Sequence, residues 1–409
     1  MVMNNTKFDI AIIGGGLAGL TQAILLGNQG WCVACIDRET PDTQTSKQYD
    51  IRTTAISWGS RNLLLNANIW QGLEGITQPI TNILIKDEDN PNSLVFDTNE
   101  VDAEAFGWII DNRDLRLQLL KKINENPNVT HITGQSVTNF NHTDTHVNIT
   151  TQNGDTISTQ LVVGADGRNS FTREAMKIGT WARDYNQNAI VTLITHEKPH
   201  NGTAIEHFRS QGPFAVLPYT DDENGKHRSA IVWTVERKDS DAWLNCPDDV
   251  FLTAIQERIG DLFGTVQLVG ARAPWPLTMN KAYSYIAPRM CLIAEAAHGI
   301  HPIAGQGLNM SLRDIAVLTE LLDKAPDLGD IAMLETYQKQ RRGDNLGMVL
   351  ATDTLNDLFG YKNPIIRAAR RFGLGVVSNL PPAKRFFMKQ AMGALGHLPA
   401  LVREHRQSV

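Results

Sequence analysis

A glycine-rich turn near the N-terminus constrains the fold most strongly. Residues 8–13, FDIAII, predict a short buried strand, and the segment after Gly19 predicts a helix. Between them the spacing is G-x-G-x-x-G, with Gly14, Gly16 and Gly19 as the three glycines. Such a turn brings backbone N–H groups and the positive end of a helix to a phosphate. The pattern therefore predicts the first βαβ unit of a dinucleotide-binding domain.

The next predicted strand ends in an acid at a suitable distance. Residues 31–37, WCVACID, predict a buried strand, and Asp37 stands 18 positions after Gly19. An acid at this place binds the ribose hydroxyls of the adenosine in dinucleotide folds, and we include the adjacent Arg38 in the same site. Strand alternation puts Cys32 and Cys35 on opposite faces, which argues against a redox dithiol. The motif does not separate NAD from FAD.

Residues from three other places are candidates for the same site. Arg52 follows a polar segment, and Arg113 lies near the start of a helix predicted within 111–120. Each is a candidate cation for the cofactor, with an ordinary surface arginine as the alternative. Asp166 and Gly167 follow a predicted strand, at the end where open α/β sheets bind ligands. A plain strand-to-turn transition is the alternative for this pair.

A second glycine-rich segment, AEAAHGIHPIAGQGLNM, covers residues 294–310. Glu295, His298 and His301 are spaced like metal ligands, but glycine and proline interrupt the helix that would bring them to one face. We therefore predict no metal site. A helix starting near Gly307 would instead direct its positive end at an anionic group such as a reduced flavin. Glu295 would then hydrogen-bond the hydroxyls of the cofactor's sugar-alcohol chain.

Composition excludes some classes of function. A chain of 409 residues with 42% apolar and 20% charged residues predicts a globular protein of two or three domains. No signal peptide is recognisable, and no apolar run reaches the ~20 residues that span a bilayer, so we expect a cytoplasmic protein. The formal net charge of −6 argues against nucleic acid as a partner.

The C-terminal segment 361–409 differs in charge from the rest of the chain. It holds nine lysines and arginines and one acid, Glu404. Apolar and basic residues recur with helical spacing in 364–377 and 382–395. Basic amphipathic helices bind anionic membrane surfaces, so peripheral contact with the inner face of the membrane is one interpretation. A helical arm packed on its own protein is the other.

Three motifs, G-x-G-x-x-G, GADGRNS and AAHGIHPIAGQGLN, occur in an order and spacing that resemble the group A FAD-dependent aromatic hydroxylases. The segments HPIAGQGLNMSLRDIAVL and 337–359 are similar to the ubiquinone-biosynthesis hydroxylases within that group, of the 2-polyprenylphenol and 2-polyprenyl-6-methoxyphenol hydroxylase type. This resemblance covers essentially the whole chain. It implies an α/β fold, in which a Rossmann-like FAD-binding domain carries an inserted, mainly antiparallel β-sheet substrate domain and a helical C-terminal arm. The implied ranges are 1–75, 101–180 and 271–335 for the FAD-binding domain, 76–100 and 181–270 for the substrate domain, and 336–409 for the C-terminal region.

The same resemblance implies the reaction. NADH or NADPH would reduce FAD, and O2 would form a flavin C4a-hydroperoxide that hydroxylates the ring of a polyprenyl phenol. The chain has no second G-x-G-x-x-G, so the nicotinamide nucleotide would bind without a Rossmann domain of its own. Other ubiquinone-biosynthesis proteins are implied as partners. A hydroxylase of a soluble aromatic compound, and a flavin- or prenyl-lipid-binding assembly subunit without turnover, remain as alternatives.

The resemblance also assigns residues to the cofactor, although no general base is predicted. Ala294 and Glu295 stand where the wider class has Gly-Asp. The implied FAD-binding residues are Gly14, Gly16, Gly19, Asp37, Arg38, Arg52, Arg113, Asp166, Gly167, Glu295, Pro302, Gly305, Gln306, Gly307, Leu308 and Asn309.

The runs GPFAVLPYT and RSAIVWTVER predict strands of an antiparallel sheet over the flavin. One face of this sheet would line the substrate pocket, with a plain core role as the alternative for each side chain. The candidate pocket residues are Phe214, Leu217, Pro218 and Trp233.

Overall fold

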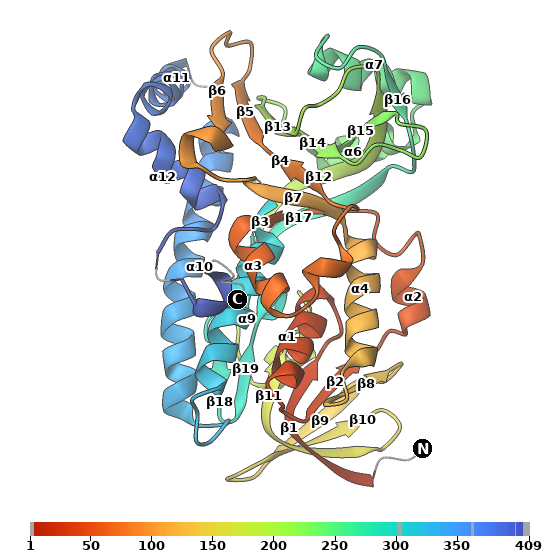
Figure 1. Cartoon of the computed structure of the whole chain (residues 1–409), viewed down its shortest axis with the longest axis vertical. Helices are drawn as coiled ribbons and strands as arrows, with labels where there is room; N and C mark the ends of the chain where they lie inside the picture. Colours follow the sequence, from red (N-terminus) through yellow and green to blue (C-terminus); the bar gives the residue numbers. More distant parts are fainter. Residues whose placement is uncertain (1–3, 301–304, 361–363, 397, 404–409) are drawn as a thin grey trace.

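The computed structural model of the chain describes residues 4–300, 305–360, 364–396 and 398–403. These residues form a mixed α/β fold with two large sheets toward opposite ends of the molecule (Figure 1). A smaller sheet lies between them, and the 30-residue helix α10 (Ile331–Gly360) runs along one side. The α/β class predicted from the sequence is confirmed.

The first large sheet contains the predicted βαβ unit. Its parallel strands are, in order across the sheet, β19 (Met290–Leu292), β11 (Thr156–Gly164), β1 (Asn4–Ile13), β2 (Val33–Asp37) and β8 (Val129–Thr133). Antiparallel pairing adds β18 (Ile286–Ala287), β10 (Val147–Thr151) and β9 (Val137–His142). Because the carboxyl ends of parallel strands meet at one edge, the loops after β1, β2, β11 and β19 converge there. Cys32 is exposed just before β2, and Cys35 is buried within β2, whose five residues are all buried.

Helices cover one face of this sheet. Ile10 and Ile12 of β1 are fully buried in the main core, as is Ile315 of α9. On the other face, Ala11 of β1 packs with Ile149 of β10. The covering helices are α1 (Leu17–Asn28), α4 (Asn112–Glu125), α9 (Gly307–Leu322) and α10.

The second large sheet is mainly antiparallel. From one edge of the sheet to the other, the hydrogen-bonded strands are β20 (His298–Gly299), β17 (Ala273–Ala282), β12 (Thr180–His196), β15 (His227–Glu236), β14 (Phe214–Tyr219), β13 (Thr203–Phe208), β5 (Asn82–Asp87) and β6 (Leu94–Asp97). Strand β16 (Val266–Leu268) also pairs with β12. Among these pairs β13 and β5 run in parallel. Helices α6 (Arg237–Asn245) and α7 (Asp248–Ile259) pack on one face.

The small sheet links the two large ones. It consists of β3 (Thr53–Ser57), β7 (Gly107–Asp111) and β4 (Gln78–Ile80), all antiparallel. The remaining short helices are α2 (Pro41–Thr45), α3 (Trp58–Asn66), α5 (Phe171–Ala175) and α8 (Ala294–Ala297), with 3₁₀ turns at 70–72, 98–101 and 400–402.

Two C-terminal helices, α11 (Pro364–Asn379) and α12 (Pro381–Ala391), lie beside β5 and β6 (Figure 1). A buried ion pair fixes α11 to the sheet, because Arg370 Nε donates to Asp87 Oδ2 at 3.0 Å and both side chains are almost fully buried. Met388 of α12 is completely buried against the same side of the sheet. The C-terminal region therefore packs on its own protein over at least part of its surface.

Replacing Arg370 by Met should leave the Asp87 carboxylate buried without its main partner. Breaking a buried pair from one side costs about 3–5 kcal/mol, and we expect the low end because Arg371 remains 3.7 Å from Asp87. Urea unfolding followed by circular dichroism measures the change. Lys122→Met, which removes the partly exposed pair with Glu125, should cost less than about 1 kcal/mol. Equal effects of the two substitutions would contradict this account.

Candidate cofactor and active site

The three glycines of the first turn differ in the space around them. Gly14 has φ of +108°, and a Cβ there would lie 2.5 Å from the carbonyl oxygen of Ala165. A Cβ on Gly19 would lie 1.9 Å from the Gly14 carbonyl oxygen, so the turn and α1 cannot pack with any side chain there. In contrast, no atom in the described part of the chain lies within 4 Å of a Cβ on Gly16, the N-cap of α1. The backbone of Gly16, at the start of α1, thus has space beside it, as a bound diphosphate requires.

Asp37 lies beside this turn at the end of β2. Its carboxylate accepts hydrogen bonds from the backbone N–H groups of Gly15 and of Glu39, the latter at 2.7 Å. The side chain of Arg38 is 78% exposed and contacts Glu39 at 3.5 Å. The acid is therefore fixed at the glycine turn, while Arg38 points to solvent.

The two arginines predicted for the cofactor are held by other parts of the site. Arg52 donates two hydrogen bonds of 2.7 Å to Asp50, and its guanidinium lies 3.5 Å from the ring centre of Trp275 on β17. Burial raises the pKa of Asp50, but hydrogen bonds and charge from Arg52 outweigh it, so the net pKa is lowered. Arg113 Nε donates to the Thr45 carbonyl at 2.8 Å. Arg52 therefore lies between Asp50, in the segment before β3, and β17 of the second large sheet.

A third arginine, Arg116, belongs to the same neighbourhood and was not predicted. It is 5% exposed, and its Nε has no hydrogen-bond partner among the described residues. Burial lowers its pKa, and the charges of Tyr49, Asp50 and Asp37 act against that shift. A buried guanidinium without a full set of partners fits an anionic ligand. The sequence feature that could have found it is its place one helical turn after Arg113, on the same face of α4.

Asp166 and Gly167 form the turn after β11. The Asp166 carboxylate accepts hydrogen bonds from Ser170 Oγ at 2.5 Å and from the backbone N–H of Thr172 at 2.8 Å. It therefore fixes the start of α5. The next residue, Arg168, contacts Thr278 Oγ1 at 2.9 Å and Glu295 at 3.4 Å, which connects this turn with the second glycine-rich segment.

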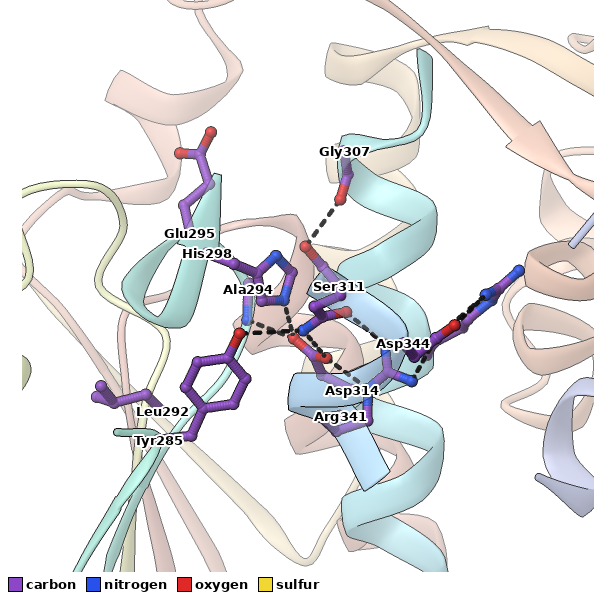
Figure 2. Close-up of polar contacts among 12 residues, drawn as sticks. Tyr285, Leu292, Ala294, Glu295, His298, Gly307, Ser311, Asp314, Arg341 and Asp344 are labelled. Atoms are coloured by element: carbon purple, nitrogen blue, oxygen red, sulfur yellow. Dashed lines mark hydrogen bonds and ion pairs between the residues drawn. The ribbon is translucent and has the colours of Figure 1, made fainter. Parts of the chain in front are cut away.

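The second glycine-rich segment separates the side chains that were spaced like metal ligands. Glu295 is half-exposed and points away from His298, which is buried and points at Asp314 of α9 (Figure 2). Ala294 has φ of +55°, a left-handed conformation unusual for alanine. His301 and Pro302 lie outside the described residues. Glu295 and His298 thus do not converge on one point.

A buried charge network lies below this segment. Asp314 is fully buried and contacts His298 Nε2 at 2.5 Å and Arg341 Nε of α10 at 2.7 Å, and it accepts the backbone N–H of Ala294 at 3.0 Å (Figure 2). Burial raises the pKa of Asp314, but His298 and Arg341 outweigh it and hold the pKa at about 2. Arg341 also binds Asp344 at 2.7 Å. The network fixes the turn after β19 to α9 and α10.

The start of α9 is anchored to the small sheet. Asn309 is buried, accepts the Ser57 N–H at 3.0 Å and donates to the Ala55 carbonyl at 2.9 Å. Gly305 has φ of +61°, and a Cβ on Gly307 would meet no atom of the described residues within 4 Å. Gln306 caps α9 and Leu308 is partly buried. The positive end of α9 is therefore held in a fixed place with space beside Gly307.

The four predicted pocket residues divide between the two faces of the second large sheet. Phe214 and Trp233 pack in a core with Phe251 of α7, whereas Leu217 faces the small sheet and α12. Alternation along β14 puts Pro218 on the Phe214 side. The prediction that one face carries all four is corrected, because two residues an odd number of positions apart in a strand point to opposite faces.

Gly16 and Gly19 should respond differently to alanine. Gly19→Ala should prevent folding of the turn, because its Cβ would overlap the Gly14 carbonyl. Gly16→Ala has room and an ordinary φ of −72°, so the melting temperature of the FAD-free protein should change little while FAD affinity falls at least tenfold. Thermal unfolding and fluorescence titration with FAD measure the two quantities. Unchanged FAD affinity of Gly16→Ala would contradict the assignment.

Comparison with known proteins identifies the family of the chain. Residues 7–348 match the family model described as FAD binding domain. Over 392 aligned residues the chain is 40% identical to ubiquinone hydroxylase UbiL of Rhodospirillum rubrum. The alignment covers 95% of this chain and 90% of the relative. It is 30% identical to the 3-demethoxyubiquinol 3-hydroxylase of Escherichia coli, with 96% of this chain and 100% of the relative covered.

Solved structures show the same fold at lower identity. The p-nitrophenol 4-monooxygenase PnpA of Pseudomonas putida superposes with a TM-score of 0.77 at 16% identity, covering 96% of this chain and 100% of that one. The protein pqsL of Pseudomonas aeruginosa superposes with a TM-score of 0.74 at 20% identity, and the superposition covers 90% of this chain and 100% of that one. Family match, relatives and fold agree, and the chain belongs to the FAD-dependent hydroxylases of ubiquinone biosynthesis, which makes it a flavoprotein monooxygenase.

Proposed function

We propose that this monooxygenase hydroxylates the aromatic ring of a polyprenyl phenol on the way to ubiquinone. The observation that carries the proposal is a continuous apolar layer between the small sheet, one face of the second large sheet, and α11 and α12. It starts at Ala55, next to the anchor of α9, passes Leu217 and Ile85, and reaches Leu374 of α11. A long apolar tail needs such a lining, whereas a small soluble aromatic compound does not. The names of the two relatives support a prenylated substrate.

Bound FAD would supply the redox chemistry of the hydroxylation, with NADH or NADPH as the electron donor and O2 as the source of the added oxygen atom. The residues around it have separate tasks. The open first turn of α1 at Gly16 would hold the diphosphate, with Arg116 as a buried countercharge. Asp37 would bind the ribose, and Glu295 the ribityl hydroxyls. The N-terminus of α9 at Gly307 would stabilise negative charge on the flavin ring, and the sheet above would exclude water.

The outer surface of the C-terminal helices supports contact with a membrane. Phe386 and Phe387 of α12 are 55% and 45% exposed, and the exposed cations Arg385 and Lys389 lie beside them in the helix. Leu380 is 49% exposed. Apolar and cationic groups together suit an anionic lipid surface, from which a lipid-tailed substrate would enter. Across the described residues no helix is long and apolar enough to cross a bilayer.

Flavin reduction tests the proposed substrate. The FAD-loaded protein is mixed without oxygen with NADH or NADPH, alone, with 2-geranylphenol, or with phenol. We expect 2-geranylphenol to speed the loss of flavin absorbance by about tenfold or more, and phenol to have little effect. Admission of O2 should then yield geranylphenol with one added oxygen atom, detected by mass spectrometry. Equal acceleration by both phenols would favour a soluble substrate, and no hydroxylated product from either would overturn the proposal.

Vesicle binding tests the membrane surface. The double substitution Phe386→Ser, Phe387→Ser should weaken binding to phosphatidylglycerol vesicles at least tenfold, because burying each ring contributes roughly 1.5–3 kcal/mol and tenfold is about 1.4 kcal/mol. Co-sedimentation with vesicles gives the bound fraction. Tyr283→Ser, which removes a side chain 62% exposed elsewhere on the molecule, serves as the matched control. Equal binding by the double variant and the wild type would exclude α12 as the contact.

A further inference from the structure

The outer face of helix α10 carries exposed apolar side chains. Helix α10 packs on α9 and lies at the edge of the molecule (Figure 1). On its inner side Arg341 is 3% exposed, whereas on its outer side Leu346 is 40% and Leu350 is 55% exposed. A Cβ on the nearby Gly343 or Gly347 would meet no described atom within 4 Å. Exposed leucines beside two glycines form a surface that a second helix can approach closely.

Charged side chains at the two ends of this face have opposite signs. Lys339 and Arg342 are exposed, and neither forms an ion pair with any residue that the structure describes. At the other end Asp353 and Asp357 contact the one guanidinium of Arg183 on β12, at 2.5 and 2.9 Å. Two carboxylates against one cation leave a negative charge that these contacts do not balance. The face is therefore basic at its start and acidic at its end.

The charged and apolar positions form one stripe along α10. At 3.6 residues per turn they lie within a sector of about 80° around the helix, and they span roughly 27 Å along it. In chain order the stripe is basic, then apolar, then acidic: Lys339, Arg342, Leu346, Leu350, Asp353 and Asp357. The order is symmetric about position 348, because 339 and 357 are equally far from it, as are 346 and 350.

A second copy of the helix in antiparallel orientation matches this stripe. A two-fold axis at position 348 brings Lys339 of one copy opposite Asp357 of the other copy. The same axis brings Leu346 of one copy opposite Leu350 of the other. Each contact then occurs twice, as in any isologous interface. In a parallel pair like charges would lie opposite each other, which disfavours association, so charge selects the antiparallel arrangement.

The strand beside α10 adds an aromatic side chain to the same face of the molecule. Trp181 on β12 is 46% exposed and stands two positions before Arg183, so alternation points both side chains toward one face of the sheet. Arg183 reaches α10 on that face. In register Trp181 is opposite Lys281 of β17, and burial and the charge of Arg342 lower the pKa of Lys281. Trp181 therefore lies between the acidic and the basic end of the stripe, and tryptophan is enriched at protein interfaces.

We propose that the outer face of α10 binds a second copy of this chain, so that the protein forms a two-fold symmetric dimer with antiparallel α10 helices. The exposed leucines and Trp181 form the apolar centre of the interface. The basic end of each stripe meets the acidic end of the other, which fixes the orientation. This inference depends neither on the substrate nor on the reaction.

Sedimentation of the complete FAD-loaded protein at about 1 to 100 µM tests the proposal. We expect the wild type to be a dimer at the upper end of this range. Leu350→Glu should raise the dissociation constant of the dimer about a hundredfold or more, because two leucines leave the interface and two charges enter it. Lys339→Glu should raise it about tenfold, because the new carboxylate meets Asp357 of the other copy.

A charge exchange tests the orientation. The double substitution Lys339→Glu, Asp357→Lys restores opposite charges across an antiparallel pair and should bind more tightly than Lys339→Glu alone. Matched controls make the same chemical changes away from α10. Leu262→Glu replaces a leucine that is 43% exposed, and Lys121→Glu replaces an exposed lysine of α4. Both should leave the dissociation constant within about twofold of the wild type.

FAD content and melting temperature report whether each variant is folded. A wild type that stays monomeric at about 100 µM would overturn the proposal. A dimer that Leu350→Glu weakens no more than Leu262→Glu does would also overturn it, because another face would then hold the two copies together. A folded double variant that binds no more tightly than Lys339→Glu would show the antiparallel orientation to be wrong. If the double variant does not fold, Leu350→Glu and its control still decide the question.

Discussion

The buried carboxylate of Asp314 holds together three parts of the chain that the site needs in fixed positions. Taking a carboxylate out of water is costly unless several partners compensate it, and Asp314 has a backbone N–H, a histidine and an arginine within 3.0 Å. Because these partners come from the turn after β19, from β20 and from α10, none of the three can move independently. The contacts of Asp314 thereby fix the start of α9, which would present the positive end of a helix to the cofactor.

The same constraint explains why Ala294 adopts a left-handed conformation. Its N–H must point at Asp314, and the next residue, Glu295, must point outward past Arg168. Such a conformation costs alanine about 1 kcal/mol or more, which the contacts of the buried carboxylate offset. Glycine adopts a left-handed conformation without strain, in agreement with the glycine that the resemblance implies at this place in the wider class of hydroxylases. Ala294 keeps the same conformation with some backbone strain.

Local patterns in the sequence predicted the parts of the site that depend on local geometry. The glycine turn, the strand ending at Asp37 and the helix from Gly307 all occur where the sequence placed them. Contacts between distant segments were not predictable in this way, because the partner of Asp87 stands 283 positions away in the chain. Phe214 and Trp233 were placed wrongly because apolar content marks a buried strand without telling which of its two faces is the inner one.

The position of Arg341 in the chain has a consequence for biosynthesis. β1 at the N-terminus pairs with β11, the sheet is extended by β19, and the charge of Asp314 is balanced only when α10 has been made. During synthesis from the N-terminus, the turn after β19 and the start of α9 therefore stay without this cation until more than four-fifths of the 409 residues have been made. The pairing of β1 with β11, which are far apart in sequence, also makes folding slow. A chain truncated just before Arg341 would retain every nucleotide-binding motif and still lack the cation that lets the domain close.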